Sequence, residues 1–123
     1  MTDFEGVIRT LSQALNKRGY LTLTPVQQAV LAPEVSSADL LVSAQTGSGK
    51  TVAFGISIAP TLLEGHERFG SDGFPQALVI APTRELALQV QRELDWLFEA
   101  AGAIVVSCVG GMDMRTERRA LGR

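Results

Sequence analysis

The sequence predicts an α/β fold in which a parallel β-sheet is flanked by helices. One observation is that three apolar runs of strand length alternate with stretches of helical periodicity; the runs are residues 40–43, 77–81 and 103–109. Strands that alternate with helices of about 12 to 18 residues are typical of βαβ units, which build parallel sheets. A second observation is that each run leads into a turn-forming junction, at residues 45–51, 82–85 and 110–111. Because parallel strands end on one edge of the sheet, these junctions are expected to share the edge where ligands bind.

The composition limits the classes of protein that fit. The 123 residues suffice for at most one domain, and 46% hydrophobic with 20% charged residues is the balance of a soluble globular protein. No apolar run reaches about 18 residues and residues 1–5 lack the profile of a signal peptide, so a cytoplasmic location without membrane contact is expected. The single cysteine, Cys108, excludes an internal disulfide and is expected in the core. A net charge of −2 excludes a general basic field that attracts nucleic acid.

Two helices are expected before the first strand. Apolar residues recur at helical spacing from Phe4 to Leu15, and a basic last turn followed by Gly19 ends this helix. A second helix is expected from Pro25 to about Leu31, because Thr24 is a good N-cap and proline is favoured at the first helical position. Gln27 then lies in the first turn of this helix, where spacing alone favours a surface position.

Two longer helices are expected after the first two strands. The stretch from Lys50 to Leu63 is apolar nearly all round, which predicts burial on several sides, and Pro60 is expected to bend or end it. A surface loop follows, in which His66 is expected to be exposed. The next helix carries one apolar stripe, with Trp96 off the stripe and partly exposed. The stripe consists of Leu86, Val90, Leu94, Leu97, Phe98 and Ala101. A last helix is expected to begin near Asp113.

The junction after the first strand reads Ala44-Gln45-Thr46-Gly47-Ser48-Gly49-Lys50-Thr51. Small residues between a strand and a helix let successive backbone N–H groups turn toward phosphate oxygens at the positive end of the helix. Lysine then supplies a mobile charge for the β- and γ-phosphates, and the threonine hydroxyl is placed to bind Mg²⁺. The general pattern G-x-x-x-x-G-K-[ST] has glycine where this chain has alanine. A plain glycine-serine turn with a surface lysine is the alternative, which the strand-to-helix context disfavours.

Four segments together resemble the DEAD-box RNA helicases of superfamily two. Residues 44–51 resemble motif I of that family, in which alanine at the first position is normal. Residues 19–27 resemble the Q motif, Pro82-Thr83-Arg84-Glu85-Leu86-Ala87 matches motif Ia, and Gly110-Gly111 matches the GG motif. Their order and spacing agree over the whole chain. The resemblance implies a P-loop NTPase with a RecA-like parallel sheet, of which residues 1–123 form part of the first domain and residues 1–32 the Q-motif region.

The resemblance also implies roles for single residues. The Gln27 amide is expected to recognise adenine, which reverses the surface interpretation, and Phe4 is expected to stack on the base. Lys50 and Thr51 are the expected catalytic residues, with Thr51 also the ligand of Mg²⁺. The remaining nucleotide-binding residues are Tyr20, Thr22, Gln45, Thr46, Gly47, Ser48 and Gly49. The expected contacts to the backbone of one RNA strand are Pro82, Thr83, Arg84, Glu85, Gly110 and Gly111, which read shape without sequence choice.

Several family motifs are not found in the 123 residues. There is no Asp-Glu-Ala-Asp segment and no Ser-Ala-Thr motif. We therefore expect the sequence to be a truncated first helicase domain that binds ATP and Mg²⁺ but does not by itself hydrolyse ATP efficiently or unwind RNA. Open strand edges are expected to leave it marginally stable. The alternatives are a non-catalytic fragment that binds nucleotide or RNA, or another P-loop enzyme such as a kinase or GTPase.

Overall fold

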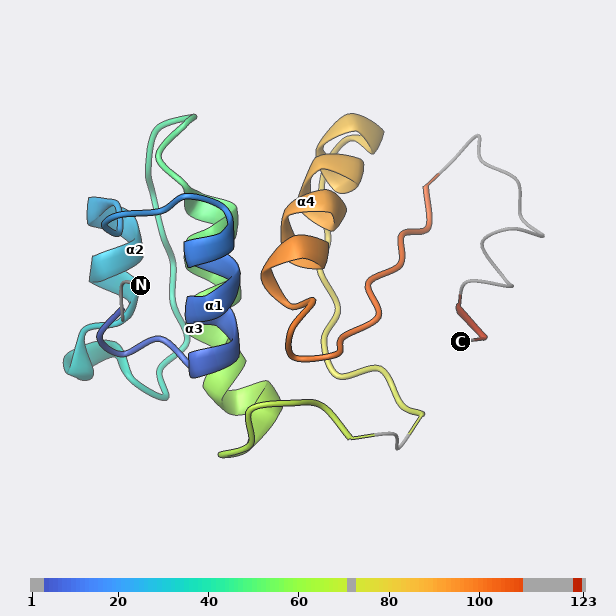
Figure 1. The fold of residues 1–123 in the computed structure, drawn as a ribbon. Helices are drawn as coiled ribbons and strands as arrows, with labels where there is room; N and C mark the ends of the chain where they lie inside the picture. The colour runs from blue at the N-terminus through green and yellow to red at the C-terminus, as the bar shows by residue number, and fades with distance from the viewer. Residues whose placement is uncertain (1–3, 71–72, 110–120, 123) are drawn as a thin grey trace.

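The computed structural model describes residues 4–70, 73–109 and 121–122. The helices are α1 (Arg9–Lys17), α2 (Pro25–Val30), the short 3-10 helix η1 (Pro33–Val35), α3 (Lys50–Leu63) and α4 (Arg84–Leu97). Helix α3 is the central one: α2 packs on one side of it and α4 on the other, while α1 also contacts α4 (Figure 1). None of the helices in the described ranges combines the length and apolar character needed to cross a bilayer.

The two N-terminal helices follow from local signals. The Thr24 hydroxyl accepts a hydrogen bond from the Gln27 backbone N–H at 3.4 Å, and Gln27 Oε1 accepts one from the Thr24 N–H at 2.9 Å, so the predicted N-cap of α2 is confirmed as a reciprocal capping box. Helix α1 begins later than predicted, at Arg9. Gly6, at φ +83°, lies in the left-handed region, which a right-handed helix cannot contain. Phe4 and Val7 instead close a turn before the helix.

The hydrophobic core joins α1, α3 and the C-terminal end of α4. Leu11 and Leu15 of α1, Ile56 of α3 and Leu97 of α4 are its largest fully buried apolar side chains. Helices α3 and α4 approach closely at Gly55, where an added Cβ would collide with the Leu97 side chain. The absence of a side chain at this glycine therefore sets the distance between the two central helices.

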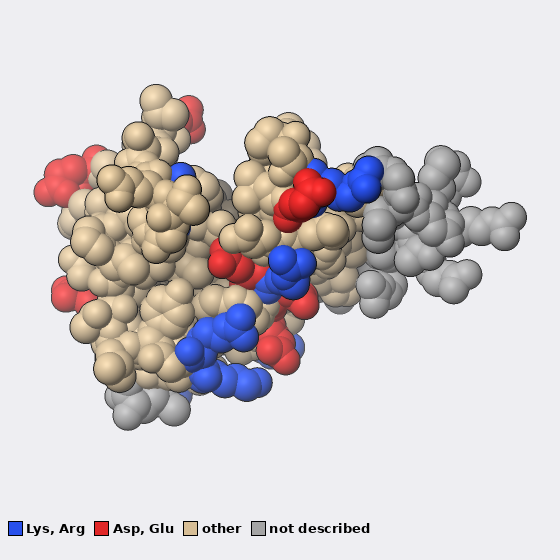
Figure 2. All heavy atoms as spheres, turned by 90° about the horizontal axis from the view of Figure 1, so that it is seen from above, with Lys and Arg blue, Asp and Glu red and all other residues tan. Residues whose placement is uncertain are grey.

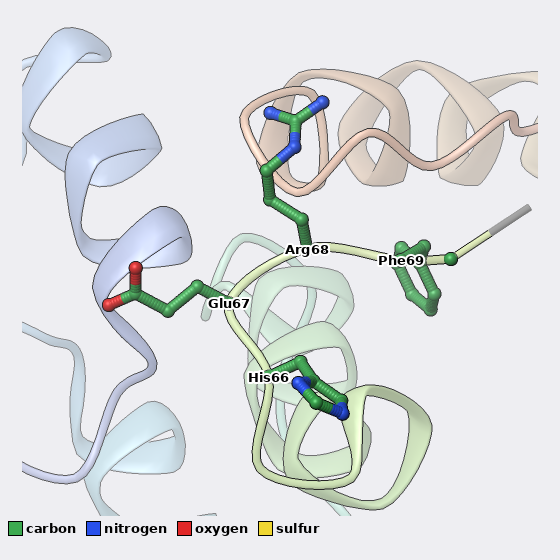
Figure 3. A pocket seen from close by; sticks show the side chains of 5 residues that line it. His66, Glu67, Arg68 and Phe69 are labelled. Atoms are coloured by element: carbon green, nitrogen blue, oxygen red, sulfur yellow. The ribbon is translucent and has the colours of Figure 1, made fainter.

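Residues 66–70 form a strap after α3 that ties α1 to the end of α4. The Glu67 carbonyl accepts a hydrogen bond from the Thr10 hydroxyl of α1 at 2.8 Å. Arg68 Nη1 donates to the Ala100 carbonyl at 2.7 Å, and Figure 3 shows its side chain reaching toward the turn after α4. The Phe69 ring packs on the Phe98 ring with centroids 6.1 Å apart. His66 is exposed, as predicted.

The three predicted strands are extended but do not pair within the described part of the chain. Residues 40–43, 77–81 and 103–109 run alongside the helices without forming a ladder (Figure 1). An extended segment becomes a strand only when a partner backbone lies about 4.8 Å away and exchanges N–H···O=C bonds with it. Without a sheet, Leu41, Leu78 and Ile80 are exposed, and Cys108 is exposed rather than in the core.

The lack of a paired sheet also explains why parts of the two long helices, α3 and α4, are more exposed than predicted. Helix α3 has the predicted bounds and continues for three residues beyond Pro60, which therefore does not end it at once. Val52, Ile56 and Leu63 are buried in it, whereas Phe54 is exposed, so one of the apolar positions of the helix is not covered. The predicted stripe is buried at its C-terminal end, at Leu97, Phe98 and Ala101, while Leu86 near the start of α4 is exposed. A packed sheet would cover these surfaces, and the described chain has none.

Candidate nucleotide site

The loop before α3 has the backbone of a phosphate-binding turn. Gly47 and Gly49 both have φ near +83°, a conformation that side chains of L-residues disfavour. Gly49 is the N-cap of α3, so the first helical residue is Lys50. Helix α3 is 14 residues long, and its N-terminus directs unpaired N–H groups and the positive end of its dipole toward the loop. This arrangement attracts anions.

Lys50 lies across this loop. Its Nζ donates a hydrogen bond of 2.7 Å to the carbonyl oxygen of Ala44, the first residue of the loop. The side chain is half-buried, as is that of Thr51 in the first turn of α3. The sequence thus brings an ammonium group and a hydroxyl to one helix terminus, which is the donor set that a magnesium-bound polyphosphate requires. Gln45 and Thr46 are exposed at the tip of the loop.

Ser48 contributes a polar atom that the chain itself does not satisfy. Its Oγ is buried and makes no hydrogen bond to the described residues. Buried hydroxyl groups in proteins nearly always have a partner, so an orphan within a glycine loop indicates a group that fits there from outside the chain. Together with the two glycines and Lys50, this atom makes the loop a fitting cradle for a phosphate.

Gln27 connects α2 to the loop. The side chain is 0% exposed, so the surface position favoured by spacing alone is wrong. Its Nε2 donates to the Gly49 carbonyl at 3.2 Å, while its Oε1 serves the α2 capping box. Adenine recognition by Gln27 stays a prediction, and it requires the amide to exchange at least one of these internal bonds for the base.

The other predicted nucleotide residues lie elsewhere. Phe4 is only 5% exposed and belongs to the hydrophobic core, so in this structure it presents no free face to a base. Tyr20 packs against Trp96 of α4, with ring centroids 6.2 Å apart, and the Arg18 guanidinium lies 4.8 Å from the centroid of the same Trp96 ring. Thr22 is exposed. Core packing and the aromatic contact account for the first two, and sequence spacing could not reveal either.

The junction at residues 82–85 is exposed, as an RNA contact requires. Thr83 caps α4, because its Oγ1 accepts a hydrogen bond from the Leu86 N–H at 3.1 Å, and Arg84 is the first helical residue. In Figure 1 the start of α4 and the loop before α3 lie at the same end of the molecule. Figure 2 looks down on this end and shows basic and acidic side chains intermingled rather than a uniformly basic face. Gly110 and Gly111 lie outside the described residues.

Two hollows were not anticipated from the sequence. One, of about 440 Å³, is lined by the strap residues 66–70 (Figure 3). The other, of about 660 Å³, lies between α1 and the end of α4, beside Lys17, Arg18 and Trp96. Neither is lined by a predicted site residue. Within the described ranges no three His, Cys, Asp or Glu residues gather as a ready-made metal site. Mg²⁺ binding by Thr51 stays a prediction.

Comparison with known proteins shows which family this chain resembles. Residues 24–123 match the family model described as DEAD/DEAH box helicase. A curated relative, DEAD-box ATP-dependent RNA helicase 53 of Oryza sativa subsp. japonica, is 40% identical over 94% of this chain and 19% of its own length. Relatives from Zea mays and Arabidopsis thaliana are named chloroplastic and mitochondrial.

Solved structures of RNA helicases are also similar to this chain. The RNA helicase Prp28 from Chaetomium thermophilum, bound to ADP, superposes with a TM-score of 0.82 at 35% identity, over 98% of this chain and 30% of that one. The DEAD-box helicase Mss116, bound to single-stranded RNA and UDP-BeF, gives 0.76 at 34% identity, over 95% and 24%.

These likenesses confirm the predicted α/β, RecA-like fold class, even though its strands are unpaired in the described residues. The chain spans less than a third of the length of each of these proteins. Its phosphate loop, its Gln27 segment and its α4 junction stand in the order that the resemblance requires. The chain belongs to the DEAD/DEAH box helicase family.

Proposed function

We propose that this chain is the ATP-binding part of an RNA-dependent ATPase that separates short RNA duplexes. The observation that carries the proposal is the bond between Gln27 and Gly49, because it joins the predicted base-reading segment to the phosphate loop in one site. Relatives named ATP-dependent RNA helicases support the choice of nucleotide and of RNA. The proposed partners are ATP or ADP, Mg²⁺ and the RNA backbone.

Different residues of the phosphate loop bind different parts of the Mg-nucleotide in this proposal. Backbone N–H groups around Gly47 and Gly49 and the α3 terminus hold phosphate oxygens. The Lys50 ammonium leaves the Ala44 carbonyl and places its charge beside the β- and γ-phosphates, and the Thr51 hydroxyl binds Mg²⁺. Bound ATP supplies the phosphoanhydride bond whose cleavage drives unwinding. Hydrolysis also needs acidic groups that hold the metal, and the sequence contains no Asp-Glu-Ala-Asp segment, so we expect no efficient turnover by this chain alone.

Gln27 determines the choice of base. Its amide offers one donor and one acceptor, which matches the acceptor N7 and the donor N6 amine of adenine. Guanine presents an acceptor oxygen in place of the amine, so the same amide pairs less well with it. This preference separates the helicase proposal from a GTPase.

RNA is proposed to bind at the start of α4. Thr83 and Arg84 are exposed at the same end of the molecule as the loop, and an exposed arginine at a helix N-terminus suits a phosphate. The contact involves the RNA backbone, so it carries no sequence choice. The cytoplasm remains the proposed location.

A calorimetric titration tests the proposal. The chain is titrated with Mg-ADP and Mg-GDP, together with Lys50→Ala and the control Lys17→Ala, which removes an exposed lysine at the end of α1. We expect saturable ADP binding, at least tenfold weaker GDP binding, loss of affinity with Lys50→Ala and none with Lys17→Ala. Equal affinity for both nucleotides, or no effect of Lys50→Ala, contradicts the proposal.

A further inference from the structure

The larger of the two hollows lies between α1 and the C-terminal end of α4. Its volume of about 660 Å³ is within the range of ligand sites in proteins. One wall comes from a single face of α1, and the other from the last turn of α4 and the turn that follows it. The lining residues are Gln13, Ala14, Lys17, Arg18, Trp96, Glu99 and Ala100, none of which belongs to the phosphate loop.

An aromatic ring holds Arg18 in place beside this hollow. The Arg18 guanidinium carbon lies 4.8 Å from the centroid of the Trp96 ring, and Tyr20 packs against the same ring. A guanidinium stacked on a ring keeps N–H groups at its edge that donate to both oxygens of a carboxylate. The Arg18 side chain forms no hydrogen bond or ion pair in the described part of the chain, so these donors are available to a ligand.

The charges around the hollow favour a peptide carboxylate over the phosphates of a nucleic acid. Lys17 adds a second positive charge next to Arg18, but Glu99 contributes a negative one. A nucleic-acid strand carries a negative charge at every nucleotide, so Glu99 repels it, and a stacking base would have to displace Arg18 or Tyr20 from Trp96. A peptide needs only one carboxylate for Arg18, and its backbone N–H groups are suitable donors to Glu99.

The remaining lining is apolar and already packed. Ala14 is buried, and Trp96 and Ala100 are half-buried. Such a surface gains free energy when an apolar side chain covers it. The hollow therefore suits a segment in which an acidic residue and an apolar residue are neighbours.

We propose that this hollow is a protein-docking site, which binds a peptide segment of a partner that carries an aspartate or glutamate beside an apolar residue. Arg18 and Lys17 pair with the carboxylate, and the apolar side chain packs on Trp96 and Ala14. The site does not depend on the proposed function, because it shares no residue with the phosphate loop. Trp96 also lies about 18 Å along α4 from Arg84 at the proposed RNA junction.

The fluorescence of Trp96 provides the measurement, because it is the only tryptophan among the 123 residues. A library of blocked random hexapeptides without tryptophan is selected on the immobilised chain, and the enriched peptides are titrated while the emission is followed. We expect enriched sequences to contain Asp or Glu beside an apolar residue. Neutral counterparts with Asn or Gln are expected to bind at least about tenfold more weakly.

Variants of Arg18 test the assigned contact. Arg18→Ala is expected to weaken binding of the enriched peptides about tenfold. Arg18→Lys keeps a cation beside the ring but not the paired donors, and is expected to lose less affinity. The control Arg9→Ala removes an exposed arginine from the other end of α1 and is expected to bind like the unsubstituted chain. Thermal unfolding without peptide ensures that each variant is titrated below its Tm.

Three results overturn the inference. One is enrichment of no peptide, or of peptides without an acidic residue. Another is equal peptide affinity in Arg18→Ala and the unsubstituted chain. The third is an Arg18-dependent change of Trp96 emission by decauridine RNA at lower concentration than by the enriched peptides, which assigns the hollow to nucleic acid. None of these results bears on the proposed function, which the titration with Mg-ADP and Mg-GDP tests separately.

Discussion

Gln27 is the residue on which the arrangement of the site depends most. A fully buried amide with both ends hydrogen-bonded fixes the distance between α2 and the phosphate loop. Periodicity could not reveal this, because a glutamine in the first turn of a short helix is usually exposed. Its burial arises from a contact between residues 22 positions apart, which only the folded chain brings together.

Substitution of Gly49 tests the contact between Gln27 and the phosphate loop. An alanine there must adopt a left-handed φ of +83°, and its Cβ would meet the Gln27 amide nitrogen and lie 3.4 Å from Thr24 Oγ1. The backbone conformation alone costs about 1–2 kcal/mol. We expect Gly49→Ala to lower the free energy of unfolding by about 2–4 kcal/mol and to weaken nucleotide binding, as measured by urea denaturation and calorimetry.

Gly65→Ala is the matched control for Gly49→Ala. Gly65 has φ +85° with nothing within 4 Å of an added Cβ, so its substitution carries the backbone cost without the collision. The two variants are therefore expected to differ by about 1–2 kcal/mol in the free energy of unfolding. An equal loss in free energy of unfolding for both variants would show that the Gln27 side chain does not clash with a Cβ at position 49.

At the scale of elements, the approach of α3 to α4 depends on Gly55. Alanine is favoured over glycine inside a helix by about 1 kcal/mol. An alanine Cβ here would, however, collide with the fully buried Leu97 and lie 3.2 Å from Leu94 Cδ2. Overpacking of this kind costs about 1–3 kcal/mol, so we expect Gly55→Ala to lower the free energy of unfolding by about 1 kcal/mol.

Chemical denaturation measures the Gly55→Ala effect, with Gly70→Ala as its control. An added Cβ at Gly70 meets nothing within 4 Å, so this variant is expected to stay within about 0.5 kcal/mol of the unsubstituted chain. A stabilising Gly55→Ala would mean that helix propensity outweighs packing at this contact.

The strap at residues 66–70 gives a second prediction at this scale. Phe69 is half-buried against Phe98, whereas Phe74 is 76% exposed and serves as the matched control. We expect Phe69→Ala to lower the free energy of unfolding by about 2 kcal/mol and Phe74→Ala to leave it nearly unchanged. Equal effects in thermal or urea unfolding would exclude the strap as a stabilising element.

The sequence predicted the helices and the phosphate loop better than it predicted the tertiary contacts and burial of individual residues. Thr24 and Pro25 located the start of α2, and the bounds of α3 were correct, because capping and periodicity act within a few residues. The phosphate loop could be recognised for the same local reason. The pairing of the strands and the burial of Cys108 were wrong for the described residues, and Leu86 of the predicted α4 stripe is exposed, since each depends on a sheet partner. Phe4 in the core and Tyr20 against Trp96 are likewise tertiary contacts that spacing does not encode.

At the scale of the whole molecule, the extended segments present apolar surface. Ile80 is 85% exposed and lies in an unpaired extended segment, which is a template for association through strand edges. We expect the chain to associate with increasing concentration and Ile80→Lys to reduce this association without changing the free energy of unfolding by more than about 0.5 kcal/mol. Analytical ultracentrifugation over a concentration series measures the effect.

Leu21→Lys is the control for Ile80→Lys. Leu21 is 80% exposed in the segment between α1 and α2, which is not one of the three extended runs, and its substitution changes the charge equally. If Leu21→Lys suppresses association as strongly, the effect is one of net charge rather than of strand edges. A monomer at every concentration contradicts the prediction altogether.

The central claim is that α2 and the phosphate loop form one nucleotide site, and amide hydrogen exchange with and without Mg-ADP tests it most directly. The account predicts slower exchange on binding at residues 45–51 and at Gln27 in the first turn of α2. It predicts no change at the strap residues 66–70, which line a separate hollow. Protection of the strap with none at residues 45–51, at saturating Mg-ADP, would contradict the account.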